Sequence, residues 1–301
     1  MQSRQFWDEI NDSCKVGSSY IKRIIDLERV PFNANLVFPD SNPEIIKELS
    51  VQVGLQHFAR VNLDLLLSFH SFLIQTTKYN ILVDTCCGNK KERPTRPFWH
   101  QRNGPFLNNL ANIGLAPSDI DFVLCTHLHA DHVGWNTQLV NGKWIPTFPN
   151  AQYLFTQKEF KYWQEEDQNN PTEPIMYGSY NDSVLPVIKS GQALLVESNH
   201  QIDDGVQLEP AYGHTPGNII VNVTNDGDQA ILCGDVIHHP IQLLKPMWST
   251  NFCFDPDLSR QTRLNLLNRC TDTHTAILPA HFHSPDYGHI ERNGDTFHLI
   301  K

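Results

Sequence analysis

The chain has 301 residues, of which 40% are apolar and 19% charged, and its formal net charge is −10. This length can bury a large core, and the composition is that of a folded globular protein. Nucleic acids and anionic lipids are bound through basic surfaces, so the acidic balance argues against both partners. We therefore expect a folded protein that binds neither nucleic acid nor membrane.

The cysteines and the N-terminal segment bear on the compartment. Seven cysteines are present, and no two of them form a CxxC pair. An odd number without paired spacing does not indicate a disulfide framework, whereas reduced thiols are typical of a cytosol. The first residues, MQSRQFWDEINDSCK, hold no apolar signal-peptide core, and no apolar run reaches the roughly 18 residues of a membrane span. We expect a cytoplasmic protein.

Short apolar runs alternate with turn signals along the chain, which predicts a mixed α and β fold in one domain, residues 1–301. Residues 1–22 precede the readable core, and we expect them to form an arm over a cleft or a dimer contact. The predicted strands cover residues 65–75, 80–84, 121–125, 151–156, 219–224, 229–233 and 275–279. The sequence Asn-Asp-Gly at 225–227 is a strong hairpin signal.

Three helices are readable from their caps and apolar faces. One runs over residues 106–113 and ends at Gly114. Thr156 and Glu159 have the spacing of a capping box at the start of a second helix. Asp257 is the expected cap of a third.

Two polar stretches, 88–104 and 165–191, predict long loops. Long loops inside a compact domain often act as lids or binding loops. We expect 165–191 to be such a substrate loop, and a mobile surface insertion is the alternative for each stretch.

The densest chemical signal lies directly after the predicted strand 121–125. His127, His129, Asp131 and His132 place four metal-ligand residue types within six positions. Neutral imidazole and carboxylate groups bind Zn²⁺, Fe²⁺, Mn²⁺ or Co²⁺. A cluster of this form arises by chance in well under about one per cent of chains of this length. Metal binding is therefore favoured over solvated loop histidines.

Three more ligand-type residues follow the ends of other strands. Asp235 and His281 each come two residues after a predicted strand, and His214 begins the turn His-Thr-Pro-Gly after an apolar-periodic stretch. Loops at rigid strand ends are a common place for site residues. His283 and His289 are alternatives to His281, which we prefer because it follows its strand directly.

This residue set resembles the metallo-β-lactamase superfamily, over residues from about 65 to 281. The resemblance implies an αββα sandwich, with two mixed sheets flanked by helices and a metal cleft at the sheet edges. It implies two divalent ions per chain, Zn²⁺ first, with Fe, Mn or Co as alternatives. It assigns three ligands to one ion, three to the other and one bridging carboxylate: His127, His129 and His214; Asp131, His132 and His281; and Asp235.

Within the superfamily, the chain is most similar to the branch with acyl-homoserine-lactone lactonases and methyl parathion hydrolase. The segments 131–136, 234–238, 259–263 and 279–282 carry this similarity. The aspartate at 235 differs from the cysteine of lactamases, so antibiotic hydrolysis is a minor hypothesis. Lactonases usually carry a tyrosine three residues after the bridging aspartate. Here that position is His238, which looks more like the phosphotriesterase-type members.

These features predict a hydrolase that uses a hydroxide bridged by two metals to cleave a small, hydrophobic lactone or ester. Asp131 is expected to orient the nucleophile and protonate the leaving group, and His238 to contact the substrate. The first alternative is a phosphotriesterase or aryl esterase. Further alternatives are a thioester hydrolase, a mono-iron persulfide dioxygenase, a nuclease, which the acidic charge disfavours, and a non-enzymatic binding module. Related enzymes often dimerise, so a homodimer is an open alternative.

Other residues near the ligands have open roles. Asp84 ends a predicted strand and is expected either to support the ligands or to form a turn. His238 and His239 follow the bridging carboxylate. Six aromatic side chains line a pocket or belong to the core, and we favour the core for each one separately: Trp135, Trp163, Trp248, Phe252, Phe254 and Phe282. Trp248 and Phe252 are the better pocket candidates, because residues 246–254 read as a loop.

Overall fold

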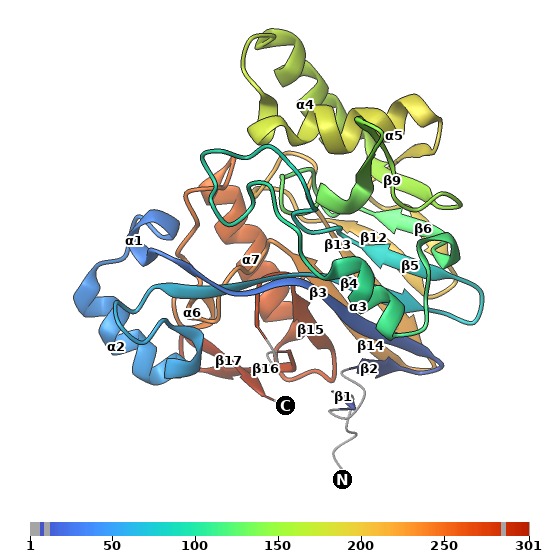
Figure 1. The fold of residues 1–301 in the computed structure, drawn as a ribbon. Coiled ribbons are helices and arrows are strands. Elements are labelled where there is room, and N and C mark those ends of the chain that lie inside the picture. Colours follow the sequence, from blue (N-terminus) through green and yellow to red (C-terminus); the bar gives the residue numbers. More distant parts are fainter. Residues whose placement is uncertain (1–6, 9–12, 284–286, 301) are drawn as a thin grey trace. The chain divides into compact units, whose positions relative to one another are not determined.

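The computed structural model describes residues 7–8, 13–283 and 287–300, and these form the expected mixed strands and helices. The chain divides into two compact units. Unit 1 comprises Met1–Asp26 and Phe69–His200, and unit 2 comprises Leu27–Ser68 and Gln201–Lys301. Each unit combines β-strands with flanking helices, which confirms the predicted fold class (Figure 1). The single-domain organisation stays a prediction.

Most of unit 1 is built on a sheet of the order β1-β2-β3-β4-β5-β6-β9-β10. Its strands are β1 Trp7–Asp8, β2 Ser13–Val16, β3 Ser19–Phe32, β4 Leu65–Gln75, β5 Asn80–Val83, β6 Phe122–Leu124, β9 Gln152–Thr156 and β10 Ala193–Val196. The described part of segment 1–22, for which we expected an arm, contributes strands to this sheet. β5, β6, β9 and β10 run parallel, so their C-terminal ends meet at one edge.

Helices and short turns of unit 1 bury its apolar side chains. The helices are α3 Phe106–Asn112, α4 Gln157–Asn169 and α5 Leu185–Ser190, with short turns η2 Pro117–Asp119, η3 Gly134–Asn136, η4 Ile175–Gly178 and η5 Tyr180–Val184. Phe106, Phe160 and Val187 from the three helices join Val123 and Phe155 of the sheet in one core. These helical elements also cover most of residues 165–191, so the prediction of a long loop there is wrong.

Unit 2 contains a second sheet, of the order β11-β12-β13-β14-β15. Its strands are β11 Gln201–Asp203, β12 Val206–Pro210, β13 Ile219–Asn225, β14 Asp228–Gly234 and β15 Ala276–Pro279. α7, Pro256–Cys270, packs Leu266 and Leu267 against Ile231 and Ile277 of this sheet. The side chain of Asp255, not that of Asp257, caps α7 by accepting from the backbone N–H of Leu258.

The remaining elements of the structure are short. In unit 2 they are α1 Ala34–Val37, α2 Pro43–Val53, η1 Leu55–His57, α6 Ile241–Leu244 and the hairpin β16 His289–Asn293 with β17 Thr296–Ile300. In unit 1 they are the hairpin strands β7 Thr137–Val140 and β8 Lys143–Pro146. No helix in the described ranges has both the length and the apolar character needed to span a membrane.

Candidate metal centre

The ligand-rich segment of unit 1 is the loop that leaves the C-terminal end of β6. One ligand atom of His127 and one of His129 lie within 4.8 Å of each other. Nε2 of His132 lies 3.8 Å from Oδ2 of Asp131, and the rings of His127 and His132 are 4.1 Å apart. Unit 1 therefore brings its four predicted ligands into one compact group.

Asp84 holds this loop from the end of the neighbouring parallel strand. Its carboxylate accepts hydrogen bonds from the backbone N–H of Thr126 at 2.7 Å and from Nδ1 of His132 at 2.9 Å. The hydroxyl of Thr126 donates to the same carboxylate and lies 3.1 Å from Nδ1 of His127. Asp84 thus contacts the predicted ligand His132, as expected of a supporting carboxylate, and its φ of +57° also fits the expected turn.

A second carboxylate, that of Glu159 on α4, supports the loop from another side. Its Oε1 accepts hydrogen bonds from the backbone N–H of Leu128 at 3.0 Å and from the indole of Trp163 at 2.7 Å. The ring of Trp163 in turn meets that of His129 edge to face, at 5.8 Å. The sequence predicts Glu159 only as part of a capping box, because nothing local indicates that its side chain reaches Leu128.

Close backbone packing explains why a glycine, Gly134, follows the loop with the predicted ligands. A Cβ atom at this position would lie 2.0 Å from the carbonyl carbon of Cys87. The backbone N–H of Gly134 donates to the carbonyl oxygen of Cys86 at 2.7 Å. Only a residue without a side chain allows this approach, and it fixes the loop against segment 86–88.

Unit 2 gathers three imidazoles around one buried carboxylate. Oδ2 of Asp235 lies 3.1 Å from Nε2 of His214 and 3.2 Å from Nε2 of His238, and its Oδ1 lies 3.0 Å from Nε2 of His281. β14 and β15 are parallel neighbours, which places Asp235 and His281 after adjacent strand ends. His214 comes from the turn between β12 and β13.

The charge balance of this group favours a cation. Burial disfavours a charged imidazole at His214, but the neighbouring Asp235 carboxylate outweighs burial and raises the pKa of His214 to about 10. Burial lowers the pKa of His238 to about 3, although Asp235 acts in the opposite direction. His238 is therefore a neutral imidazole at physiological pH, whereas the Asp235 carboxylate stabilises a positive charge on His214.

The hydrogen bonds on Nδ1 test whether these histidines suit a metal ion. Nδ1 of His132 faces the Asp84 carboxylate, and Nδ1 of His281 lies 2.9 Å from the carbonyl oxygen of Ser68. Both partners only accept hydrogen bonds, so Nδ1 carries the proton and Nε2 of the neutral ring bears a lone pair. Because Nε2 of His281 faces a carboxylate oxygen at 3.0 Å, a cation is favoured there. Such partners on Nδ1 are typical of metal-binding histidines, so the donor set fits divalent ions.

His238 contacts the ligand group of unit 2. Its ring lies 4.8 Å from that of His214 and stacks on that of His281 at 5.8 Å. Gln242 holds its backbone by accepting from the N–H of His238 at 2.7 Å. Nδ1 of His238 is buried and makes no hydrogen bond to the described residues. Contact of His238 with substrate stays a prediction.

The alternative histidine ligands lie elsewhere in unit 2. The ring of His283 packs against that of His57 at 4.8 Å, and His289 faces His274 at 6.1 Å. His239 has both nitrogens engaged, with Nε2 at 3.1 Å from the carbonyl oxygen of His57 and Nδ1 accepting from the backbone N–H of Ile241. Of these histidines and His281, it is His281 whose Nε2 reaches Asp235.

The aromatic candidates separate into core and surface. Trp135 stacks on Phe106 within the core of unit 1, and Phe282 belongs to the core of unit 2. Trp248 packs on Phe38 at 5.9 Å. Phe252 and Phe254 are 40% and 59% exposed, and the ring of Phe252 lies 6.5 Å from that of His238. Phe252 is thus the aromatic of loop 246–254 that combines exposure with closeness to His238.

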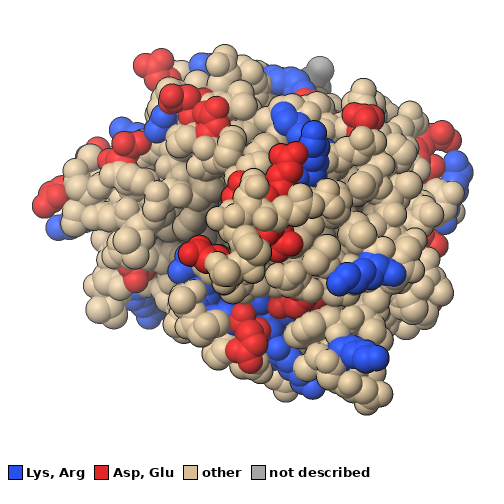
Figure 2. Space-filling model, turned by 90° about the horizontal axis from the view of Figure 1, so that it is seen from above, with Lys and Arg blue, Asp and Glu red and all other residues tan. Residues whose placement is uncertain are grey.

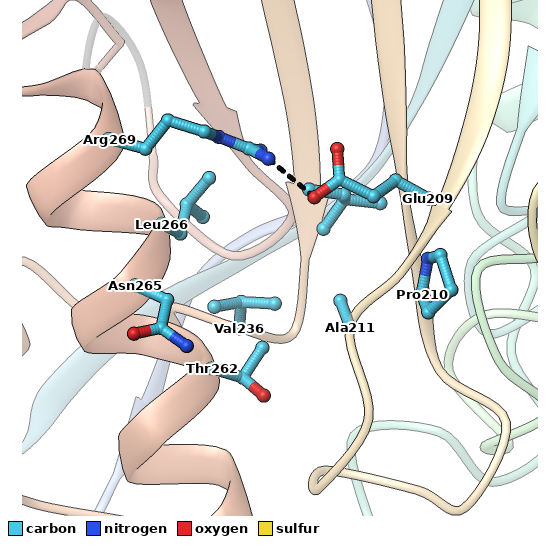
Figure 3. A pocket seen from close by; sticks show the side chains of 9 residues that line it. Glu209, Pro210, Ala211, Val236, Thr262, Asn265, Leu266 and Arg269 are labelled. Atoms are coloured by element: carbon cyan, nitrogen blue, oxygen red, sulfur yellow. Dashed lines mark hydrogen bonds and ion pairs between the residues drawn. The ribbon is translucent and has the colours of Figure 1, made fainter.

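A separate cavity of about 200 Å³ lies between α7 and strands β12 and β13. Figure 3 shows Arg269 reaching across it to Glu209, where Nη1 and Oε1 are 2.5 Å apart. The other lining residues are Pro210, Ala211, Ile220, Val236, Thr262, Asn265 and Leu266. None of them is a predicted ligand, so this cavity is distinct from the ligand groups.

Relatives of known sequence support a hydrolase family. The chain is 28% identical over 162 residues to an N-acyl homoserine lactonase of a Bacillus species, which covers 49% of this chain and 54% of the relative. It is 33% identical over 121 residues to a probable metallo-hydrolase of Methanocaldococcus jannaschii, which covers 34% of this chain and 55% of that protein. The matched regions thus span little more than half the length of these two relatives.

Solved structures share the fold at low identity. The hydrolase AbOPH of the β-lactamase superfamily is 22% identical with a TM-score of 0.79, over 96% of this chain and 97% of that one. AidC, a dizinc quorum-quenching lactonase, is 21% identical with a TM-score of 0.75, over 96% of each chain. Residues 70–281 match the family model of the metallo-beta-lactamase superfamily. Because this match covers well over half of the chain, the protein belongs to the metallo-beta-lactamase superfamily.

Proposed function

We propose that this protein is a two-metal hydrolase that opens small, hydrophobic lactones. The observation that carries the proposal is the complete set of seven ligand-type side chains, four gathered in unit 1 and three in unit 2. His127, His129 and His214 would hold the first ion, Asp131, His132 and His281 would hold the second, and Asp235 would be shared by both. Membership in the superfamily supports this division of the ligands.

The chain's own residues hold the reacting groups in place. When bound, two divalent ions lower the pKa of a shared water and polarise a substrate carbonyl. Asp84 and Ser68 fix the ligand histidines through Nδ1, which keeps the site organised before substrate arrives. The side chain of Asp131 is 14% exposed, so it can accept a proton from the attacking water and return it to the leaving oxygen.

Two features support a hydrophobic lactone as substrate. One relative is an N-acyl homoserine lactonase, and we extend that activity to this chain as a proposal. Loop 246–254 exposes Met247, Phe252 and Phe254, and exposed apolar side chains beside a polar site suit an acyl chain.

His238 supports a second candidate, hydrolysis of phosphotriesters or aryl esters. It occupies the position where lactonases usually carry tyrosine. A neutral imidazole whose Nδ1 is buried without a hydrogen bond to the described residues offers a lone pair rather than a phenolic proton. Rejection of every lactone together with turnover of phosphotriesters would favour this candidate.

We further propose that the protein acts in the cytoplasm on a small molecule, without a nucleic-acid partner. All seven cysteines are free thiols, as expected in a reducing compartment. On the face seen in Figure 2, Lys and Arg side chains are scattered among Asp and Glu side chains over a largely uncharged surface. A continuous basic stripe, which a phosphate backbone requires, is not seen on that face.

Proton release from a panel of lactones tests the proposed reaction. Zinc-loaded protein is assayed on simple γ-lactones and on acyl-homoserine lactones of increasing chain length, with Asp131→Ala as the inactive control. We expect turnover that rises with acyl length and falls by at least about a hundredfold in the control. Turnover equal in both proteins would refute the lactonase proposal.

A further inference from the structure

We infer that Cys253 is a positioning residue for the metal ligand His214. Sγ of Cys253 lies 3.6 Å from Nδ1 of His214, on the side of the ring opposite the nitrogen that faces Asp235. A ligand that binds metal through Nε2 needs its proton on Nδ1 and an acceptor for that proton. In His132 and His281 the acceptors are a carboxylate and a carbonyl oxygen. In His214 the thiol sulfur takes this place.

The thiol is itself held by a short hydrogen-bonded chain. Cys253 donates to the hydroxyl oxygen of Ser259 at 3.3 Å and lies 3.4 Å from the hydroxyl of Thr250. Nη2 of Arg263 donates to the same Ser259 oxygen at 3.3 Å. The two hydroxyl groups hold the sulfur in place, so it fixes the plane of the imidazole as well as its proton.

Arg263 connects this chain to the strand end that carries Asp235. Its side chain is fully buried and donates from Nε to the carbonyl oxygen of Val236 at 2.8 Å, and from Nη1 to those of Pro246 and Trp248. The guanidinium therefore links the backbone next to Asp235 with the serine that orients Cys253. One network supports two of the proposed ligands.

The backbone around His214 also contacts the segment that carries Cys253. A Cβ atom on Gly213, whose φ is +125°, would lie 2.3 Å from the backbone nitrogen of Ser259. The carbonyl oxygens of Gly213 and His214 accept from the N–H groups of Asp255 and Phe254, both at 2.9 Å. The two residues directly after the thiol, Phe254 and Asp255, thus tie its loop to the turn that carries His214.

This assignment rests on the proposed function in one respect, that His214 binds metal. We would measure zinc affinity by competition with a chromophoric chelator, without any substrate. Cys253→Ala is expected to weaken zinc binding about 10- to 100-fold, as losses of such supporting partners do. Cys253→Ser, whose hydroxyl also accepts and donates, is expected to restore most of the affinity. Cys270→Ala is the matched control, because it removes a buried thiol from the apolar core of the same unit.

The zinc titrations distinguish a failure of the proposed function from a failure of the role assigned to Cys253. Absence of zinc binding in the unaltered protein would refute the proposed function itself. If that protein binds zinc but Cys253→Ala binds equally well, or loses no more than Cys270→Ala, the role of Cys253 is refuted. An equal loss in the alanine and serine variants would also refute it, because the acceptor would then not matter.

A measurement on the unaltered chain covers the case in which the alanine variant does not fold. Long-range ¹H–¹⁵N spectra of the zinc-bound protein report which imidazole nitrogen carries a proton. We expect His214 to be protonated on Nδ1 with a signature shifted from that of His132, because sulfur is a weaker acceptor than carboxylate. Zinc bound through Nδ1 of His214 would overturn the assignment.

Discussion

Buried partners of the predicted ligand histidines fix these rings through contacts with Nδ1. Asp84 is the clearest example, because it binds His132 and the backbone of Thr126 at once. We predict that Asp84→Asn weakens zinc binding and lowers kcat/KM about 10- to 100-fold, since an amide cannot hold the same proton as firmly. Isothermal titration with zinc measures the first effect. Asp121→Asn, at the other end of β6, is the control, and an equal effect there would contradict the explanation.

We propose that His238 contacts the substrate and decides between lactones and phosphotriesters. We predict that His238→Tyr raises the ratio of lactone to phosphotriester kcat/KM about fivefold, because one hydrogen bond to a carbonyl oxygen is worth about 1 kcal/mol. Zinc content should stay unchanged, which separates a substrate contact from a metal ligand. Loss of zinc from His238→Tyr would show that His238 is a ligand.

The candidate ligand residues can be identified from the sequence because metal chemistry restricts both residue type and position. His127 to His132 and Asp235 follow directly after apolar strand patterns. The residues that contact these candidate ligands cannot be predicted from the sequence. Cys253 is 39 residues from His214, and Ser68 acts through its carbonyl oxygen, 213 residues from His281. No local pattern distinguishes a carbonyl or thiol that supports a metal site from any other.

At the scale of elements, a buried ion-pair cluster joins segment 88–104 to the helical turns η4 and η5. Arg93 forms two hydrogen bonds to the Asp182 carboxylate, at 2.7 and 2.9 Å, and Nζ of Lys91 lies 3.4 Å from it. We predict that Asp182→Asn lowers the free energy of unfolding by about 3–5 kcal/mol, because it leaves buried cations unpaired. Asp257→Asn, which breaks an exposed pair with Arg260, should cost less than about 1 kcal/mol. Urea unfolding at pH 7 compares them, and equal costs would contradict the role of burial.

The buried Asp182 carboxylate also makes the free energy of unfolding depend on pH. Burial opposes ionisation of Asp182, but Arg93 and Lys91 outweigh it and lower its pKa below the ordinary 3.8. The unfolded chain therefore takes up the proton first, so the stabilisation is complete above pH 3.8 and is lost as pH falls through the lowered pKa. Urea unfolding of the unaltered protein and of Asp182→Asn, followed from pH 7 to pH 3, should show a difference in free energy of unfolding that becomes smaller in acid. A difference that stays constant over this range would contradict the explanation.

Strands with continuous or alternating apolar residues are predictable, as β4, β5 and β14 demonstrate, whereas charged strands are not. β3 carries Lys22, Arg23 and Asp26, of which Asp26 is buried by a contact with Arg102 at 2.5 Å. That partner is distant in sequence, so periodicity alone does not reveal the strand. The β7–β8 hairpin differs, since Asn141 and Gly142, both at positive φ, form a turn signal that sequence reasoning could have used.

At the scale of the whole molecule, metal binding should contribute to stability. Removal of zinc by a chelator is predicted to lower Tm by several degrees, because zinc at a hundredfold excess over Kd stabilises the folded state by about 2.7 kcal/mol. Readdition of zinc should restore Tm, and magnesium, which prefers oxygen ligands, should not. Differential scanning calorimetry provides the comparison. A Tm that neither the chelator nor zinc changes would argue against a structural contribution of the metals.

The central claim is a site for two metals on one chain, and counting the bound metal tests it most directly. Metal content per chain would be measured after zinc loading and gel filtration, for the unaltered protein and for Asp235→Ala, with lactone hydrolysis recorded on the same samples. We predict two equivalents in the unaltered protein, at most one in the variant, and activity that follows occupancy. One equivalent or none in the unaltered protein, or hydrolysis that persists after all metal is removed, would contradict the account.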